Sequence, residues 1–221
     1  MKKIVIIGAG GNSKVIVDTI KKRNVLQKEP LKIMGVLDDA EEKKELCGFP
    51  VLGPVNEIEK LKWEPDVFFV NGIGNNAVRK RIYEAYSDAK WYTLIHPTAI
   101  IAEDVVIGEG TIVMPGAIIN TESRIGRFAL INTGSIIEHE NEIGDFVHLA
   151  SGVTTAGEVK IGEGTMLGTG VKVIQGIKIG KHTIIGAGAC VIKNIPDDVI
   201  AVGVPAKVIK RTNGKGEKFR G

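Results

Sequence analysis

The chain has 221 residues and a formal net charge of +3 at pH 7, with 43% hydrophobic and 25% charged residues. This composition is typical of a soluble protein of one or two domains, and so small a charge gives no support for nucleic-acid binding. Cys47 and Cys190 are too far apart in sequence to indicate a disulfide framework or a metal site. No stretch is apolar for long enough to insert in a membrane, and the apolar run at the N-terminus is too short for a signal peptide. The sequence therefore predicts a cytoplasmic protein.

The first part of the chain, residues 1–94, alternates between strand and helix patterns. Apolar runs at Lys3–Ile7, Leu31–Leu37 and Val67–Val70 predict strands, and Ser13–Arg23 and Asn75–Tyr86 predict helices. This βαβ order predicts a small Rossmann-like domain with a parallel sheet of about four strands. A complete dinucleotide-binding domain needs more strands than that, so a nucleotide-sugar site is favoured over an NAD site.

The turn after the first strand reads "GAGGNS" and contains Gly8, Gly10 and Gly11. Backbone N–H groups of such a turn, at the start of a helix, bind phosphate groups. Ser13 stands where the dinucleotide fingerprint has its last glycine, so the match is incomplete. Asp38, at the end of the next strand, is a candidate for binding a ribose hydroxyl. The alternative is a tight strand–helix turn without a ligand.

Residues 95–221 follow a period of six. An aliphatic residue recurs at every sixth position from Ile101 to Val191, and only Thr155 breaks this rule. A small or β-branched residue follows four positions later in nearly every hexad. This repeat predicts a parallel β-helix in which three hexads form one triangular coil and residues eighteen apart stack. The basic C-terminal segment 207–221 is expected to be a solvated tail.

The repeat is interrupted by the triplet Glu138–His139–Glu140, and the next position, usually small and apolar, holds Asn141. A polar group at such a position destabilises the coil unless its hydrogen bonds are satisfied, so we interpret this interruption as functional. An imidazole next to carboxylates is suited to act as a general base, with Glu140 or Glu138 orienting the ring. The alternative is a surface histidine in a charged turn.

The other three histidines carry less information. His148 follows His139 by nine residues, or half a coil, so the two are expected on different faces of the same subunit. We consider ligand binding and a purely structural role equally supported for His148. His96 and His182 are interpreted as structural or surface residues. No histidine has the spacing of a metal ligand, so no metal is expected.

Three motifs together resemble one family: "IIGAGG", "GIGNNAVRKRI" and "INTGSIIEHE". The chain is similar, up to about Arg211, to the bacterial sugar O-acyltransferases related to sialic acid O-acetyltransferase. That family includes N-acetyltransferases acting on UDP-4-amino-4,6-dideoxy sugars. The resemblance implies a left-handed β-helix, acetyl-CoA as co-substrate, and a homotrimer with active sites between subunits.

The resemblance also assigns roles to individual residues. It makes His139 the general base and Glu140 the residue that raises its basicity. The positions implied to contact acetyl-CoA are Asn132, His148, Gly157, Thr169 and Ala187. The positions implied to bind the nucleotide sugar are Gly10, Gly11, Asn12, Asp38 and Asp39. This chain has Asn12–Ser13 where relatives often carry His-Gly, which leaves the identity of the sugar open.

The predicted function is acetyl transfer from acetyl-CoA to the amino group of a UDP-linked 4-amino-4,6-dideoxy sugar, in bacterial glycan or polysaccharide biosynthesis. O-acetylation of sialic acid or a related sugar hydroxyl is the first alternative. A non-catalytic nucleotide-sugar-binding scaffold is the second, and an NAD-linked sugar oxidoreductase is a weaker third. The sequence determines neither the sugar nor the choice between nitrogen and oxygen as acceptor.

Overall fold

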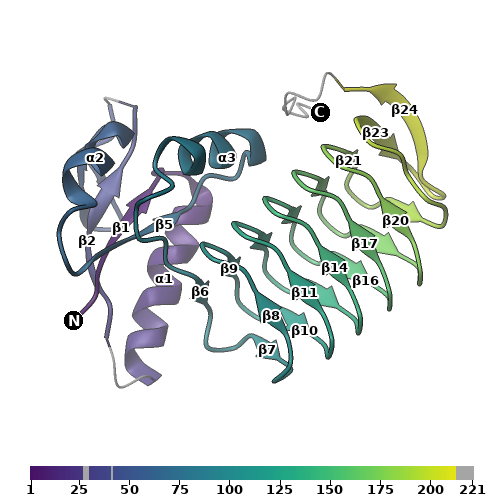
Figure 1. Cartoon of the computed structure of the whole chain (residues 1–221), viewed down its shortest axis with the longest axis horizontal. Coiled ribbons are helices and arrows are strands. Elements are labelled where there is room, and N and C mark those ends of the chain that lie inside the picture. Colours follow the sequence, from purple (N-terminus) through teal and green to yellow (C-terminus); the bar gives the residue numbers. More distant parts are fainter. Residues whose placement is uncertain (27–29, 41, 213–221) are drawn as a thin grey trace.

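The computed structural model describes residues 1–26, 30–40 and 42–212. A compact α/β domain lies at one end of a long coil of short strands (Figure 1). The N-terminal domain contains the following elements: β1 (Lys3–Ile7), α1 (Gly11–Leu26), β2 (Lys32–Leu37), β3 (Glu45–Leu46), β4 (Phe49–Gly53), the 3-10 helix η1 (Val55–Glu57), α2 (Ile58–Leu61), β5 (Val67–Asn71) and α3 (Asn76–Ala85).

The sheet of this domain has five strands in the order β3-β4-β2-β1-β5, whereas the sequence predicted about four and located three of them. The strands that the prediction missed form the hairpin of β3 and β4, which pair in antiparallel fashion. Cys47 and Gly48 join them, and both have positive φ, 52° and 83°. A two-residue hairpin turn with positive φ at both central residues matches the twist of the strands it connects. The first helix also starts earlier than predicted, at Gly11.

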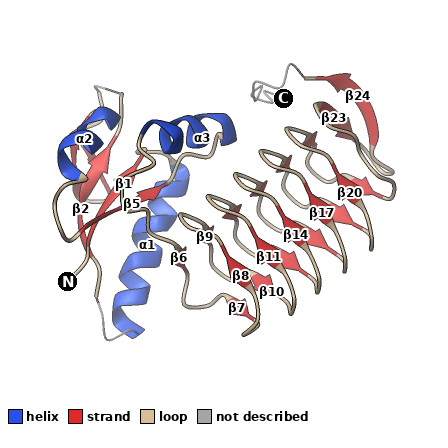
Figure 2. Ribbon diagram, viewed as in Figure 1, coloured by secondary structure: helices blue, strands red, loops and turns tan. Residues whose placement is uncertain are grey.

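The second part of the chain is a left-handed parallel β-helix with three sheets, as predicted (Figure 2). One sheet, which we name the docked face, contains β6 (Leu94–Ile95), β9 (Ile112–Val113), β12 (Leu130–Ile131), β15 (His148–Leu149), β18 (Met166–Leu167), β21 (Ile184–Ile185), β23 (Val199–Val202) and β24 (Lys207–Arg211). The second, the apolar face, contains β7 (Ile100–Ile101), β10 (Ile118–Ile119), β13 (Ile136–Ile137), β16 (Thr154–Thr155), β19 (Lys172–Val173) and β22 (Cys190–Val191). The third, the charged face, contains β8 (Val106–Ile107), β11 (Arg124–Ile125), β14 (Glu142–Ile143), β17 (Lys160–Ile161) and β20 (Lys178–Ile179).

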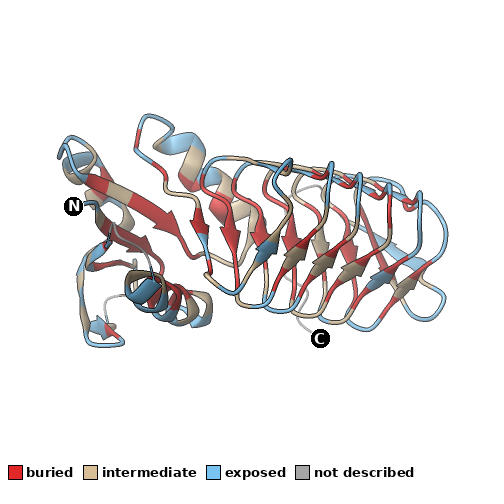
Figure 3. Cartoon of the chain, turned by 90° about the horizontal axis from the view of Figure 1, so that it is seen from below, coloured by how far each residue is buried: buried red, intermediate tan, exposed pale blue. Residues whose placement is uncertain are grey.

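The hexad pattern explains the core of the coil. The second residue of each two-residue strand points inward and stacks on the residue eighteen positions later, as Ile119 does on Ile137. Thr155, the one exception in sequence, is also fully buried. Figure 3 shows the resulting rows of buried residues along the coil. Because β6 already pairs with β9, we propose the domain boundary at about residue 94.

The outward residues distinguish the three faces. The N-terminal domain covers the first coils of the docked face, where Ile112 and Leu130 share a core cluster with Ile16 of α1. The apolar face presents its first four outward side chains to solvent or leaves them half-buried: Ile100, Ile118, Ile136 and Thr154. The charged face presents Arg124, Glu142, Lys160 and Lys178. Of the predicted solvated tail, Lys207–Arg211 forms the exposed strand β24, and residues 213–221 lie outside the described residues.

Candidate active site

Asn141 anchors the polar triplet to the coil. Its side chain is fully buried, and its Nδ2 donates to the carbonyl oxygens of Glu138 at 2.7 Å, His139 at 3.1 Å and Ala156 at 2.9 Å. The polar residue in a core position therefore has donors matched to main-chain acceptors, and these bonds fix the backbone on both sides of His139. The Nδ2 group thus meets the condition under which a polar group is tolerated in an apolar register, while the buried Oδ1 has no recorded partner among the described residues.

The structure selects Glu140 rather than Glu138 as the partner of the His139 ring. His139 Nδ1 lies 2.9 Å from Glu140 Oε2, while Glu138 Oε2 accepts a hydrogen bond from Asn120 at 2.8 Å. Both side chains of the His139–Glu140 pair are about half exposed in the single chain. Glu140 has φ of 58°, and this left-handed conformation turns its side chain back toward the preceding histidine. Asn120 is a contact that the sequence reasoning missed.

Gly157 lies directly under the ring of His139, eighteen residues later and one coil further. A Cβ atom at Gly157 would fall 2.7 Å from His139 Nε2 and 3.0 Å from Nδ1. The absence of a side chain at this position is therefore what allows the ring to lie against the next coil. Within the described residues, the structure records no hydrogen-bond partner for the N–H group of Gly157. This N–H group is consequently available to a ligand next to the histidine.

His148 and Asn132 form a second group, on the docked face. Asn132 Nδ2 lies 3.4 Å from His148 Nε2, a long contact, and the Asn132 Oδ1 accepts from the N–H of Thr133. His148 is only 7% exposed. The pKa of His148 is lowered to about 4, chiefly by burial and also by the nearby Arg79 guanidinium, with a partial offset from the backbone of Gly74. The imidazole is therefore neutral at pH 7, a state that can accept as well as donate a hydrogen bond.

The remaining candidate contacts for acetyl-CoA lie along the edge where the docked face turns into the apolar face. Thr169 and Ala187 are exposed there, one coil apart. Asn132 is at the same edge, while His139 and Gly157 are at the edge between the apolar and charged faces. The candidate residues thus occupy the two edges that flank the apolar face, and the structure of one chain does not bring the two groups together.

In the N-terminal domain, Asp38 connects two loops. Its Oδ2 accepts from the N–H of Ala9 in the glycine-rich turn, and its Oδ1 accepts from Ala40. Burial raises the pKa of Asp38, but the N–H groups of Ala9 and Ala40 and the Lys43 ammonium outweigh it, so the pKa lies below the usual value. Asp38, which was predicted to bind a ribose hydroxyl, is thus already engaged with protein N–H groups on both oxygens. Oδ2 also contacts the Lys43 ammonium, while Oδ1 retains a further lone pair.

A cavity of about 420 Å³ adjoins Asp38 and Asp39, with Lys43 and Gly53 in its lining. Asp39 Oδ1 accepts from the N–H of Val55, which fixes the carboxylate at the rim. This volume falls within the range of small-molecule sites. The cavity is a candidate binding site for part of the acceptor.

The glycine-rich turn contacts the loop before α3. Gly10 and Gly11 have no heavy atom within 4 Å of where a Cβ would be. A Cβ at Gly74 would lie 3.0 Å from Asn12 Nδ2, and one at Gly72 would collide with Ser13 Oγ. The two residues that replace the usual His-Gly therefore pack against glycines of this loop.

The other titratable groups have structural surroundings. His96 is buried and its Nδ1 contacts the Thr98 hydroxyl, as expected for a structural histidine, and His182 lies 3.5 Å from Asp198. Within residues 1–26, 30–40 and 42–212, the structure has no cluster of three or more His, Cys, Asp or Glu side chains that could hold a metal ion. Over the same ranges, none of the helices has the length and apolarity needed to cross a lipid bilayer.

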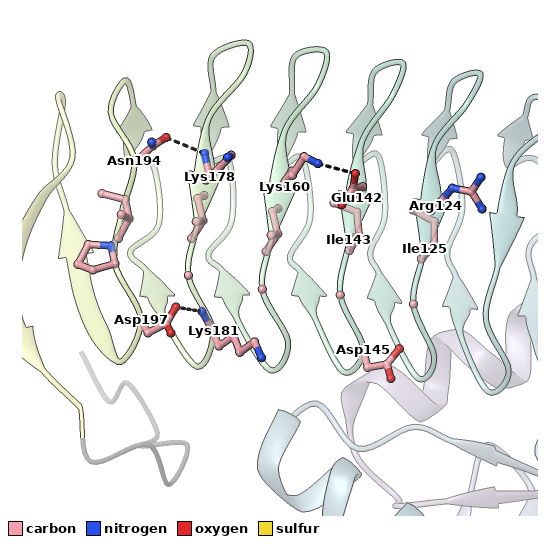
Figure 4. A pocket seen from close by; sticks show the side chains of 18 residues that line it. Arg124, Ile125, Glu142, Ile143, Asp145, Lys160, Lys178, Lys181, Asn194 and Asp197 are labelled. Atoms are coloured by element: carbon pink, nitrogen blue, oxygen red, sulfur yellow. Dashed lines mark hydrogen bonds and ion pairs between the residues drawn. The ribbon is translucent and has the colours of Figure 1, made fainter.

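A cavity of about 860 Å³ lies on the charged face and contains none of the candidate residues (Figure 4). Arg124, Glu142, Lys160 and Lys178 line it, and Lys160 forms an ion pair with Glu142 at 2.6 Å. It is a wide, shallow depression along an exposed sheet, and we assign no ligand to it.

Comparison with known proteins agrees with this two-part architecture. Residues 3–86 match the profile of the PglD N-terminal domain, and residues 158–193 match that of the bacterial transferase hexapeptide repeat. UDP-N-acetylbacillosamine N-acetyltransferase from Bacillus subtilis is 43% identical over 115 residues, which is 51% of each protein. The matched segment thus spans about half the length of that curated relative.

Solved structures match over nearly the whole chain. A histidine-to-asparagine mutant of perosamine N-acetyltransferase from Caulobacter crescentus, in complex with CoA and GDP-perosamine, is 34% identical with a TM-score of 0.86 and covers 95% of this chain and 97% of that chain. The acetyltransferase domain of PglB from Neisseria gonorrhoeae, in complex with acetyl coenzyme A, is 31% identical with a TM-score of 0.86 and covers 94% and 99%. The chain therefore belongs to the PglD-like family of hexapeptide-repeat N-acetyltransferases.

Proposed function

We propose that this protein transfers the acetyl group of acetyl-CoA to the amino group of a nucleotide-linked 4-amino-4,6-dideoxy sugar, with a UDP-linked sugar as the first acceptor to test, in glycan or polysaccharide biosynthesis. The observation that carries the proposal is the His139 ring, which Glu140 orients and which occupies the space where a side chain at Gly157 would lie. Two of the relatives named above are named for or bound to a nucleotide-linked amino sugar, and two hold CoA or acetyl-CoA.

In the proposed mechanism, His139 is the general base and the N–H group of Gly157 stabilises the oxyanion. With Nδ1 donating to Glu140, the neutral ring of His139 has its lone pair on Nε2 and removes a proton from the acceptor amine. The amine nitrogen attacks the thioester carbon, and the developing oxyanion accepts from the N–H of Gly157, an interaction typically worth about 3 kcal/mol of barrier. Collapse of the tetrahedral intermediate breaks the carbon–sulfur bond. The thiolate of CoA leaves and is protonated by the imidazolium.

We propose a homotrimer whose apolar faces point toward a threefold axis. Outward residues Ile100, Ile118 and Ile136 form an apolar stripe, as expected for a face covered by other subunits. In such a trimer, the edge between the apolar and charged faces of one subunit lies beside the edge between the docked and apolar faces of its neighbour. His139 of one subunit then meets Asn132 and His148 of the next, and acetyl-CoA lies between the two edges.

Subunit exchange tests this arrangement. His139→Ala and His148→Ala proteins, each inactive by itself, are mixed under conditions that exchange subunits, and exchange is verified by native mass measurement. Shared sites restore part of the activity because some interfaces then carry an intact pair. Exchange without any recovery would mean that the two residues act within one chain or not together.

The acceptor is identified with a panel of UDP- and GDP-linked 4-amino sugars, the matching 4-hydroxy sugars and sialic acid, scored by release of the CoA thiol. Turnover with the amino sugars alone supports N-acetylation. Turnover with sialic acid or a 4-hydroxy sugar identifies the alternative O-acetyltransferase. Binding of a nucleotide sugar without thiol release from acetyl-CoA for any member would favour the scaffold.

We place the reaction in the cytoplasm in this proposal. Both proposed substrates carry several phosphate charges, and such molecules do not cross a lipid bilayer unaided.

A further inference from the structure

Helix α3 runs along the edge between the charged and docked faces and supplies a row of hydrogen-bond donors to it (Figure 1). The acceptors are the carbonyl oxygens of Phe128, Phe146 and Gly164, which are eighteen residues apart and share a left-handed backbone conformation, with φ of 53°, 58° and 67°. Arg79 Nε donates to Phe128 at 2.8 Å, and Arg79 Nη2 donates to Phe146 at 2.9 Å. Asn76 Nδ2 continues the row to Gly164 at 3.0 Å.

The same guanidinium also holds the loop that precedes α3. Arg79 Nη1 donates to the carbonyl oxygen of Ile73 at 2.9 Å, and Nη2 donates to Asn76 Oδ1 at 2.9 Å. One side chain therefore joins three parts of the molecule: the loop 72–75, the Asn76 arm, and two consecutive coils. A planar fork with five donors can make this set of bonds, whereas a lysine ammonium cannot span it.

Burying the guanidinium group of Arg79 costs free energy. It is 2% exposed, and among the described residues its recorded hydrogen-bond partners are carbonyl and amide oxygens rather than carboxylates. Burial lowers the pKa of Arg79 to about 9, which leaves the group protonated at neutral pH. A buried charge without a counter-ion is costly, and an apolar interface of the same volume often gives equal or greater stability. Stability alone is therefore a weak reason for an arginine at this position.

Arg79 lies between the loop that contacts the glycine-rich turn and the backbone that precedes His148. The loop it holds lies against the glycine-rich turn, where Gly74 faces Asn12. On the other side, it binds the carbonyl oxygens of Phe146 and Val147, the two residues immediately before His148. An error of 1 Å in the placement of an acceptor can cost about a hundredfold in rate.

We propose that Arg79 is a positioning residue without contact to either substrate. It fixes the loop 72–75, and with it the glycine-rich turn that is expected to bind the acceptor, relative to the edge that binds acetyl-CoA. This inference rests on the proposed acetyl transfer. In a trimer it applies whichever subunit supplies His139, because the orientation of each N-terminal domain on its own coil determines where the acceptor arrives.

The test compares Arg79→Lys, which keeps the charge but loses the fork, with Arg79→Met and with Arg124→Lys as a matched exchange on the charged face. We expect Arg79→Lys to stay folded, to bind acetyl-CoA within twofold of the wild type, and to lose at least tenfold in kcat with the acceptor, with a smaller change in KM. Arg79→Met is expected to show the same split, and Arg124→Lys to leave all three values unchanged. A folded Arg79→Lys protein with wild-type kcat would overturn the proposal.

Hydrogen exchange gives a readout that does not depend on turnover. In Arg79→Lys, amides of residues 72–79 and 146–148 should exchange at least tenfold faster, while the distant coils, such as residues 172–185, should be unaffected. Unchanged exchange in 72–79 would overturn the positioning role even if the enzyme were active. If the wild type fails to acetylate every acceptor but the exchange difference appears, the proposed function is wrong and the link between the two domains stands.

Discussion

Replacing Gly157 by alanine tests the contact on which the proposed mechanism depends. The added Cβ would lie nearest to His139 Cε1 and 2.7 Å from Nε2. Because ordinary van der Waals contact begins at about 3.4 Å, the ring must move by more than the 0.7 Å that is missing at Nε2. A displacement of about 1 Å at a reacting group costs about a hundredfold. We therefore expect kcat to fall by about 10- to 100-fold. The backbone of Gly157 lies outside the positive-φ region, so alanine introduces no backbone strain there.

The assay is thiol release under saturating acetyl-CoA, with thermal unfolding as the check on folding. A double-mutant cycle separates the ring from other effects: His139→Ala, Gly157→Ala and the combination. By itself, His139→Ala should lose the 10²- to 10⁴-fold typical of a general base. In that background the extra methyl group meets no ring, so Gly157→Ala should add little. If Gly157→Ala lowers the rate equally in both backgrounds, its effect does not pass through His139.

Two further predictions follow from the open space around Gly11 and from the burial of His148. Gly11→Leu should fold normally, because no heavy atom lies within 4 Å of the new Cβ, and should weaken nucleotide-sugar binding while sparing acetyl-CoA in calorimetry; equal losses for both ligands would contradict the division of labour between the domains. His148 has a pKa of about 4 in the folded chain and about 6.5 when unfolded, so only the unfolded state binds a proton as pH falls through this window. The free energy of unfolding should therefore drop by up to about 3 kcal/mol between pH 6.5 and 4, and His148→Gln should show a shallower dependence in urea titrations.

The coil could be predicted from sequence because each hexad repeats the same local solution. Ile119, Ile137 and their equivalents are inward residues in every coil, so a single register determines the sheets, the edges and the stacking of residues eighteen apart. The contact of His139 with Gly157 follows because the two residues are eighteen positions apart. Asn141 was detectable for the same reason, since a polar residue stands out against a strict pattern.

The features that escaped prediction depend on contacts that no local pattern encodes. The hairpin of β3 and β4 was missed because β3 has only two residues and its turn places a cysteine in the left-handed region. Arg79 belongs to the motif "GIGNNAVRKRI", but the sequence indicated no role for it, and only the docking of α3 on stacked carbonyl groups gives it one. The family resemblance pointed to Glu140 as the partner of His139, but the residue pattern alone left Glu138 open, because the Asn120 contact that engages Glu138 comes from the preceding coil.

The turn residues of the coil add an independent argument for the edge that binds acetyl-CoA. In the hexads from Ile107 to Ile185, the third residue after each inward aliphatic has a φ between 50° and 72°. On the other two edges this conformation is adopted by six residues that are not glycine: Glu122, Phe128, Glu140, Phe146, Glu158 and His182. On the docked/apolar edge it is adopted only by glycines: Gly116, Gly134, Gly152, Gly170 and Gly188. The backbone alone therefore does not require glycine at this edge.

Crowding within the chain does not require it either, because no heavy atom lies within 4 Å of a Cβ at any of these five glycines. A bare edge beside Thr169 and Ala187 is what an extended ligand or a neighbouring subunit needs for close approach. Gly170→Asn should fold, since asparagine tolerates the left-handed region, and should weaken acetyl-CoA binding at least tenfold in calorimetry. His182→Asn, with φ of 50° on the edge between the charged and docked faces, is the matched control and should bind normally. Normal acetyl-CoA affinity in folded Gly170→Asn would mean that the co-substrate does not run along this edge.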